Sequence, residues 1–161
     1  MSESLLIHEQ YMRQALYEAH QALHSADVPV GAVVVVQDTI LGRGRNQREA
    51  LADPTAHAEV LALRAAARQL GSWRLTEATL YVTLEPCIMC LGAAVLSRLQ
   101  RLVFGCRDVK AGACGSQFDI LATGRLNHTF PIIAGVCERE ASALLSRFFR
   151  ELRQTARHGA G

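Results

Sequence analysis

Two short runs of residues constrain this chain more than any other feature: His57-Ala58-Glu59 and Pro86-Cys87-Ile88-Met89-Cys90. Imidazole nitrogen and deprotonated sulfur are ligands that zinc prefers in proteins, and a catalytic zinc ion keeps one of its four tetrahedral positions for water. His57, Cys87 and Cys90 would fill three positions and leave the fourth open. The fold must therefore bring two separate segments together around one ion.

The residues before each run are typical of helix starts. Asp53, followed by a proline, is suited to cap a helix, which would place His57 near that helix's start. Glu85-Pro86 would open a second helix in the same way, with Cys87 in its first turn and Cys90 on the same face. We expect the positive ends of both helices to point at the ion, which favours thiolate over thiol.

Glu59 turns this predicted metal site into an enzyme hypothesis. A carboxylate two residues after a ligand does not share that ligand's helix face, so we expect Glu59 to reach past the ion to its bound water. There it could accept a proton and deliver it elsewhere. Zinc lowers the pKa of bound water towards neutrality, so a nucleophile would be available at physiological pH.

The cysteines could instead form a redox pair or a closed structural zinc site. A redox C-x-x-C pair usually sits in a thioredoxin-like context, without a partnered H-x-E run. A closed structural zinc site needs a second Cys/His pair, and the spacing of Cys106 and Cys114 is poor for that purpose. An odd total of five cysteines argues against a disulfide scaffold, so Cys106, Cys114 and Cys137 are predicted to be reduced thiols.

Length and composition fit one soluble domain spanning residues 1–161, since the chain is 50% hydrophobic and long enough for a sizeable core. No run approaches the roughly 18 apolar residues that a membrane span requires, and the N-terminus is acidic where a signal peptide would be basic. We therefore expect a cytoplasmic protein with no membrane association. The net charge of +2 does not by itself indicate a nucleic-acid partner.

Hydrophobic periodicity predicts alternating strands and helices. Helices are expected over residues 9–25, from about 54 to 70, 86–97, 118–122 and 138–157, and strands over 28–36, 40–46, 79–84, 101–105 and 129–134. Strand, helix, strand at this spacing predicts parallel pairing, and ligand sites in such sheets lie at the carboxyl ends of strands. The order predicts a three-layer α/β/α architecture.

The two runs match the H-x-E…P-C-x-x-C signature of the zinc-dependent nucleoside and nucleobase deaminases. Over nearly its full length the chain also resembles the bacterial tRNA adenosine deaminases. The segments that carry this resemblance are 28–33, 53–59, 78–87, Arg107-Asp108-x-Lys110-x-Gly112 and Leu144-Leu-x-x-Phe-Phe-Arg150. The resemblance implies the cytidine-deaminase-like fold, an α/β fold with a five-stranded mixed sheet and the metal between the starts of two helices.

It also implies the reaction, which is hydrolysis of the wobble adenosine of a tRNA, an arginine tRNA by resemblance, to inosine and ammonia. One zinc ion per subunit would activate the water at its fourth position, with Glu59 protonating N1 and then the leaving amine and with no organic cofactor. An enzyme acting on folded RNA must extrude the base and hold the flanking backbone of the anticodon stem-loop. The expected substrate-binding residues are Asn46, Val30, Ala58 and Leu84 around the base, and Asp108, Lys110, Phe149 and Arg150 at the neighbouring nucleotides.

Two other functions stay open. A small-molecule deaminase of the guanine or cytidine type would act without RNA, and the Asp108/Lys110 loop and the Phe-Phe-Arg helix speak against it. A non-catalytic, zinc-bearing RNA-binding subunit would have no need of Glu59. The resembled family is homodimeric, and residues 91–96 are apolar nearly all round, so their helix is expected to be fully buried or part of a subunit interface.

Overall fold

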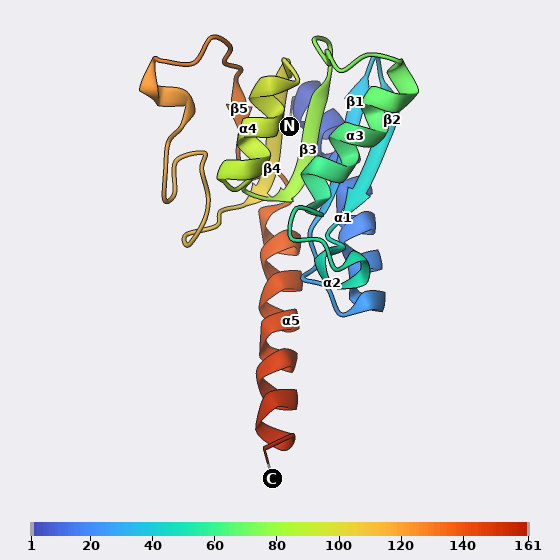
Figure 1. Cartoon of the computed structure of the whole chain (residues 1–161), viewed down its shortest axis with the longest axis vertical. Helices are drawn as coiled ribbons and strands as arrows, with labels where there is room; N and C mark the ends of the chain where they lie inside the picture. The colour runs from blue at the N-terminus through green and yellow to red at the C-terminus, as the bar shows by residue number, and fades with distance from the viewer. Residues whose placement is uncertain (1, 161) are drawn as a thin grey trace.

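A mixed sheet organises residues 2–160, the part of the chain that the computed structural model describes (Figure 1). Its five strands lie in the order β2-β1-β3-β4-β5, with β1 antiparallel to β2 and β3, and β4 parallel to β3 and β5. The strands are β1 Gly31–Val36, β2 Thr39–Arg45, β3 Thr79–Leu84, β4 Arg101–Cys106 and β5 Ile132–Ile133. The predicted five-stranded mixed sheet is confirmed, while the two end residues of the predicted 1–161 domain lie outside the described part.

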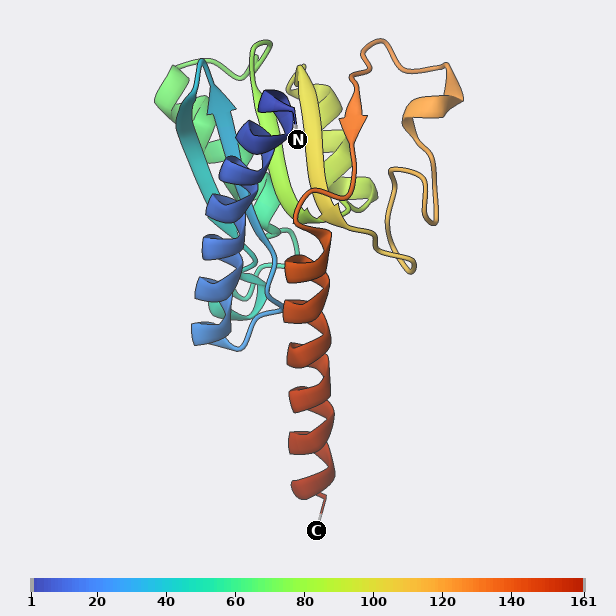
Figure 2. The same ribbon diagram turned by 180° about the vertical axis from the view of Figure 1, so that it is seen from behind.

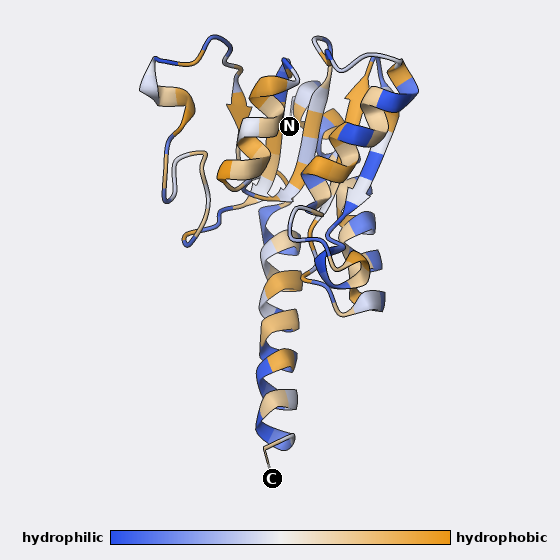
Figure 3. Cartoon of the chain, viewed as in Figure 1, coloured by the Kyte–Doolittle hydropathy of each residue, from blue (hydrophilic) through white to orange (hydrophobic). Residues whose placement is uncertain are grey.

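Helices cover both faces of the sheet, as the three-layer prediction requires. α3 (Ala58–Leu70) and α4 (Ile88–Leu96) lie on one face, and α1 (Glu3–Ala22) and α5 (Glu138–His158) on the other (Figures 1 and 2). The lower half of α5 projects beyond the sheet, and Figure 3 shows blue, hydrophilic residues recurring along it. The remaining short elements are α2 (Arg48–Leu51) and two 3₁₀ turns, Leu23–Ser25 and Leu121–Thr123.

The central strands are buried on both faces, which explains why β1 is apolar at every position. Val34 packs with Leu80 in the core beneath α3 and α4, whereas Val33 packs with Tyr81 in the core beneath α1. Alternate residues of a strand point to opposite faces, so a strand between two helical layers needs apolar residues at both sets of positions.

Small residues let α3 lie close to the sheet. Ala58, Ala62 and Ala66 recur at a spacing of four, which places them on one helix face, and all three are buried. Opposite them, a Cβ atom at Gly44 would overlap the carbonyl oxygen of Ala58. This close approach fixes the first turn of α3, and with it His57, against β2.

Local hydrogen bonding moves the start of α3. Asp53 was expected to cap this helix, and that expectation is wrong: its carboxylate accepts bonds of 2.8 Å from both the amide and the hydroxyl of Thr55. Such Asx turns compete with helix formation. The helix therefore begins at Ala58 with His57 as its N-cap residue, and Cys87, expected in the first turn of the second helix, is likewise the N-cap residue of α4.

The other boundaries differ by smaller amounts. α1 begins six residues before the predicted position 9, the expected helix over 118–122 is a 3₁₀ turn, and the edge strand shrinks to Ile132–Ile133. α2 was not predicted. None of the five cysteines forms a disulfide, which agrees with the expectation of reduced thiols at Cys106, Cys114 and Cys137. Among residues 2–160, no helix combines the length and apolarity needed to cross a membrane.

A buried histidine on the inner face of α1 gives the fold a predictable response to acid. His8 shares a hydrogen bond of 2.9 Å with the hydroxyl of Tyr81, and burial, with a smaller effect from the positive charge of Arg101, holds the pKa of His8 below its usual value of 6.5. Between its folded and unfolded pKa values, the unfolded chain binds more protons. The stability that neutral His8 contributes is therefore present above pH 6.5 and lost as the pH falls below that value towards the folded pKa.

We accordingly expect the free energy of unfolding to fall below pH 6.5 in the wild type and to fall less in His8→Gln, whose side chain does not titrate. Urea unfolding at several values between about pH 5 and 8 measures both slopes. Equal slopes in the two proteins would contradict the assignment.

Candidate metal centre and active site

The three predicted metal ligands come together. Nδ1 of His57 lies 3.6 Å from Sγ of Cys87 and 3.5 Å from Sγ of Cys90, and the three ligand atoms all lie within 4.8 Å of one another. A tetrahedral zinc ion with bonds of about 2.0 Å to nitrogen and 2.3 Å to sulfur would hold such atoms about 3.5 Å apart. The donor set therefore fits a tetrahedral metal ion with three protein ligands.

Two helix N-termini hold these ligands in place. The carbonyl groups of the two N-cap residues, His57 and Cys87, accept the first helical bonds from Leu61 (3.1 Å) and Leu91 (2.9 Å). Cys90 lies in the first turn of α4. Although both helices start later than expected, their positive ends still meet at the ligand cluster.

The two thiols are electrostatically coupled. A hydrogen bond with Cys90 and a weaker one with His57 lower the pKa of Cys87 to about 4, against an opposing effect of burial. The same contact and burial raise the pKa of Cys90. The contact between the two thiols thus favours the first thiolate and disfavours the second, and a divalent cation would favour ionisation of both.

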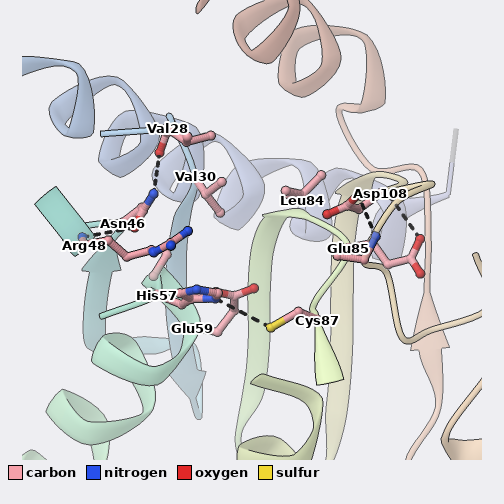
Figure 4. Close-up of a pocket in the computed structure, with 12 residues that line it drawn as sticks. Val28, Val30, Asn46, Arg48, His57, Glu59, Leu84, Glu85, Cys87 and Asp108 are labelled. Atoms are coloured by element: carbon pink, nitrogen blue, oxygen red, sulfur yellow. Dashed lines mark hydrogen bonds between the residues drawn. The ribbon is translucent and has the colours of Figure 1, made fainter. Parts of the chain in front are cut away.

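Glu59 lies beside the metal ligands with its side chain almost fully buried. It is 4% exposed, and Figure 4 shows its carboxylate adjacent to His57 on the floor of a pocket that both residues line. Burial raises the pKa of Glu59 to about 7. A carboxyl group with such a pKa can both accept and donate a proton near neutral pH.

The pocket above Glu59 is small. Its volume of about 210 Å³ lies below the range of roughly 300–1,000 Å³ typical of drug-sized ligands, so it suits one planar base better than a larger molecule. Besides His57, Glu59 and Cys87, the predicted substrate-binding residues that line it are Asn46, Val30, Ala58, Leu84 and Asp108.

Asn46 has already committed part of its hydrogen-bonding capacity. Its Nδ2 donates to the carbonyl of Val28 (3.2 Å) and its Oδ1 accepts from the amide of Arg48 (3.3 Å), as the dashed lines in Figure 4 show. One hydrogen and one lone pair remain available. Because both internal hydrogen bonds hold the Asn46 amide in place, its free hydrogen and free lone pair point in fixed directions.

A wider groove continues from this pocket. It has a volume of about 660 Å³ and lies between residues 106–111 and α5, with Lys110 and Phe149 among the residues that line it. Arg150, predicted to act beside Phe149, is exposed and does not line the groove; Arg153 does. Arg150 directly follows Phe149 in the helix and is therefore turned away from it by about 100°. Arg153, four residues after Phe149, lies on the same helix face.

Glu85 was expected only to open the second helix, but it anchors the loop after β4. Its buried carboxylate accepts hydrogen bonds from the amides of Asp108 (3.3 Å), Cys114 (3.1 Å) and Ser116 (3.2 Å), and from the hydroxyl of Ser116. Its position directly after a buried strand was the available signal, since the carboxyl ends of parallel strands form ligand sites. The contacts themselves bridge 23 to 31 positions of sequence, which no local pattern reveals.

We expect Glu85→Ala to destabilise the protein by about 3 kcal/mol or more, because three amides and a hydroxyl would lose a buried acceptor at a cost of about 1–3 kcal/mol each. The KM for the expected RNA substrate should rise as well, since Asp108 would lose its support. Urea unfolding and steady-state kinetics measure the two effects. Glu140→Ala, which removes an exposed carboxylate 3.7 Å from Arg13, is the control and should change stability by no more than about 0.5 kcal/mol. Similar effects of the two substitutions would refute the anchoring role.

The three-layer fold and the His57/Cys87/Cys90 cluster with its adjacent buried carboxylate define a zinc-type deaminase with the cytidine-deaminase-like fold. The sequence model of the MafB19-like deaminase family matches residues 7–153 of this chain.

The individual relatives of this chain are also deaminases. The chain is 48% identical over 146 residues to the tRNA-specific adenosine deaminase of Bacillus subtilis strain 168, covering 91% of each chain. It is 47% identical over 147 residues to the enzyme of the same name from Haemophilus influenzae, covering 91% of this chain and 85% of that one. A solved structure from a study of A-to-I editing by tRNA:A34 deaminases at the wobble position superimposes with a TM-score of 0.82 at 39% identity, covering 84% of this chain and 99% of the other. The chain belongs to the family of bacterial tRNA-specific adenosine deaminases.

Proposed function

We propose that this protein hydrolyses the wobble adenosine in the anticodon of a tRNA to inosine, releasing ammonia. The observation that carries the proposal is the buried carboxylate of Glu59 beside three metal ligands, on the floor of a pocket sized for one base. Family membership supports adenosine in tRNA as the substrate. The expectation of an arginine tRNA comes from the sequence resemblance alone. Because tRNA is the substrate, we expect the protein to act in the cytoplasm.

We propose zinc for this donor set: His57, Cys87 and Cys90 would hold one ion per subunit, with a water as the fourth ligand. When bound, it lowers the pKa of that water and so supplies the nucleophile that adds to C6 of the base. Glu59 would take up the proton that the water releases and pass it to N1. It would then carry the proton of the new hydroxyl on C6 to the amino group, which leaves as ammonia while C6 becomes a carbonyl. The buried surroundings of Glu59 keep bulk water from competing for these protons.

The remaining residues would bind the RNA. We propose that Val30, Ala58 and Leu84 enclose the extruded base while Asn46 hydrogen-bonds to it or to its ribose. Asp108, Lys110 and Phe149 line the route by which the neighbouring nucleotides would leave the pocket. Arg150, exposed on the projecting part of α5, would meet a more distant phosphate.

The experiment that tests this proposal uses anticodon stem-loops with either adenosine or cytidine at the wobble position, together with free adenine, guanine and cytidine. Inosine from the adenosine stem-loop alone is the expected result. Uridine from the cytidine stem-loop alone would overturn the choice of base. Turnover of a free base or nucleoside without RNA would instead support a small-molecule deaminase.

We also propose that the protein is a homodimer, as its family resemblance implies. Ile88, Gly92 and Leu96 recur at a spacing of four on α4; Ile88 is 52% and Leu96 70% exposed, and the space beside Gly92 is open. Such an apolar stripe is suited to a subunit interface. Light scattering of the wild type and of Leu96→Glu should give a dimer and a monomer respectively, and a monomeric wild type would exclude the proposal.

A further inference from the structure

Arg48 is the one lysine or arginine among the described residues that line the small pocket. Its side chain extends from the start of α2 across the pocket and lies next to His57 in Figure 4. The ion pairs found within residues 2–160 do not include this guanidinium. Among the described residues, this cationic group thus lies at the pocket without a direct ion pair to an acidic side chain.

The backbone beneath this side chain is fixed by long-range contacts. The carboxylate of Asp27, only 1% exposed, accepts hydrogen bonds from the amides of Glu49 (2.7 Å) and Ala50 (3.2 Å) in α2. The amide of Arg48 donates to Asn46, and its carbonyl accepts from the amide of Asp53 at 3.1 Å. A surface arginine held in this way loses less conformational freedom when it binds a ligand.

Apart from the metal ligand His57, the other ionisable side chains that line the pocket are acidic. Asp108 lies on the far side in Figure 4, and its carboxylate is held by the amides of Lys110 (3.0 Å) and Ala111 (3.1 Å). Glu59 and Cys87 lie on the floor. An anionic group entering with the substrate would be repelled by the Asp108 wall and attracted to Arg48 on the wall formed by α2.

We propose that Arg48 binds a backbone phosphate directly adjoining the target nucleotide, and so sets the direction in which that nucleotide enters the pocket. A guanidinium is suited to this task because its planar donors match two phosphate oxygens at once. The inference rests on the proposed function, since a free base carries no phosphate. It adds a binding residue that the sequence motifs do not mark.

The test is a double-mutant cycle between Arg48→Gln and the RNA. Three stem-loops are compared: one unmodified, one with a neutral methylphosphonate 5′ to the target adenosine, and one with it 3′. Arg48→Gln should lower kcat/KM on the unmodified RNA by about tenfold to a hundredfold, mainly through KM, and reduce the slope of log affinity against log salt by about one. The methylphosphonate at one of the two positions should weaken the wild type similarly and leave Arg48→Gln unchanged.

Two further variants separate a phosphate contact from a structural effect. Arg48→Lys keeps the charge without the planar donors, so it should keep the salt slope and recover part of the lost affinity. Arg68→Gln removes an exposed arginine on α3 outside the pocket and should behave as the wild type. Losses that add independently at both phosphates, or an unchanged salt slope in Arg48→Gln, would overturn the inference.

The cycle is measured both as affinity for the stem-loop and as turnover. The coupling between Arg48 and the phosphate can therefore be determined whether or not the wild type forms inosine. Additive losses alongside wild-type inosine formation would refute the phosphate contact alone. Absence of inosine from the wild type would refute the proposed function, whatever the coupling.

Discussion

Replacing Glu59 by alanine is expected to lower inosine formation by about a hundredfold to ten-thousandfold, while bound zinc and the folded structure are retained. Glu59 is the buried carboxylate beside the metal ligands, and general acid–base groups contribute rate factors of this size. It is not one of the three clustered ligand side chains, so the metal should stay bound. Single-turnover assays of inosine and atomic absorption measurements of zinc check the two halves of the prediction.

Two controls sharpen the Glu59 experiment. Glu59→Gln keeps the shape of the side chain but cannot take up a proton, so it should be about as inactive as Glu59→Ala. Glu77→Gln changes an exposed carboxylate that accepts a hydrogen bond from Gln37 outside the pocket, and should retain wild-type activity. A Glu59→Ala enzyme within about tenfold of the wild type would contradict the proton-transfer role. A wild type that binds the stem-loop but forms no product, like Glu59→Ala, would point to a non-catalytic RNA-binding subunit.

Replacing Cys90 by alanine is expected to reduce bound zinc to background and abolish activity. Cys90 is the buried one of the three predicted metal ligands, and its loss leaves only His57 and Cys87. Stability should fall too, since a ligand at a hundred times its Kd stabilises the folded state by about 2.7 kcal/mol. A chelator should therefore lower the Tm of the wild type and leave that of Cys90→Ala unchanged.

The matched control for Cys90 is Cys137→Ala, which removes a half-buried thiol at the start of α5. This variant should keep its zinc, its activity and its response to the chelator. Stoichiometric zinc in Cys90→Ala would show that the three clustered side chains are not the ligand set.

Much of the chemistry could be predicted because it depends on residue type and short spacing. The pairing of His57 with Glu59 and of Cys87 with Cys90 marks a metal site with an adjacent acid wherever the helices begin. For that reason the three predicted ligands lie together even though Asp53 does not cap the helix. The helices α3 and α4, whose starts carry the ligands, begin at the edge of the sheet where strand ends commonly form ligand sites.

The sequence by itself thus determined the layered architecture, the metal ligands and the adjacent acid, since hydrophobic periodicity and ligand chemistry are local properties. Only the tertiary structure decided which polar side chains support the pocket. Asp27 holds α2 from 22 positions away, and Glu85 holds Ser116 from 31 positions away. The rotation of α5 about its axis, as it packs against the sheet, places Arg153 rather than Arg150 in the groove. These contacts depend on distances that exist only once the layers have packed together, so no spacing along the chain could reveal them.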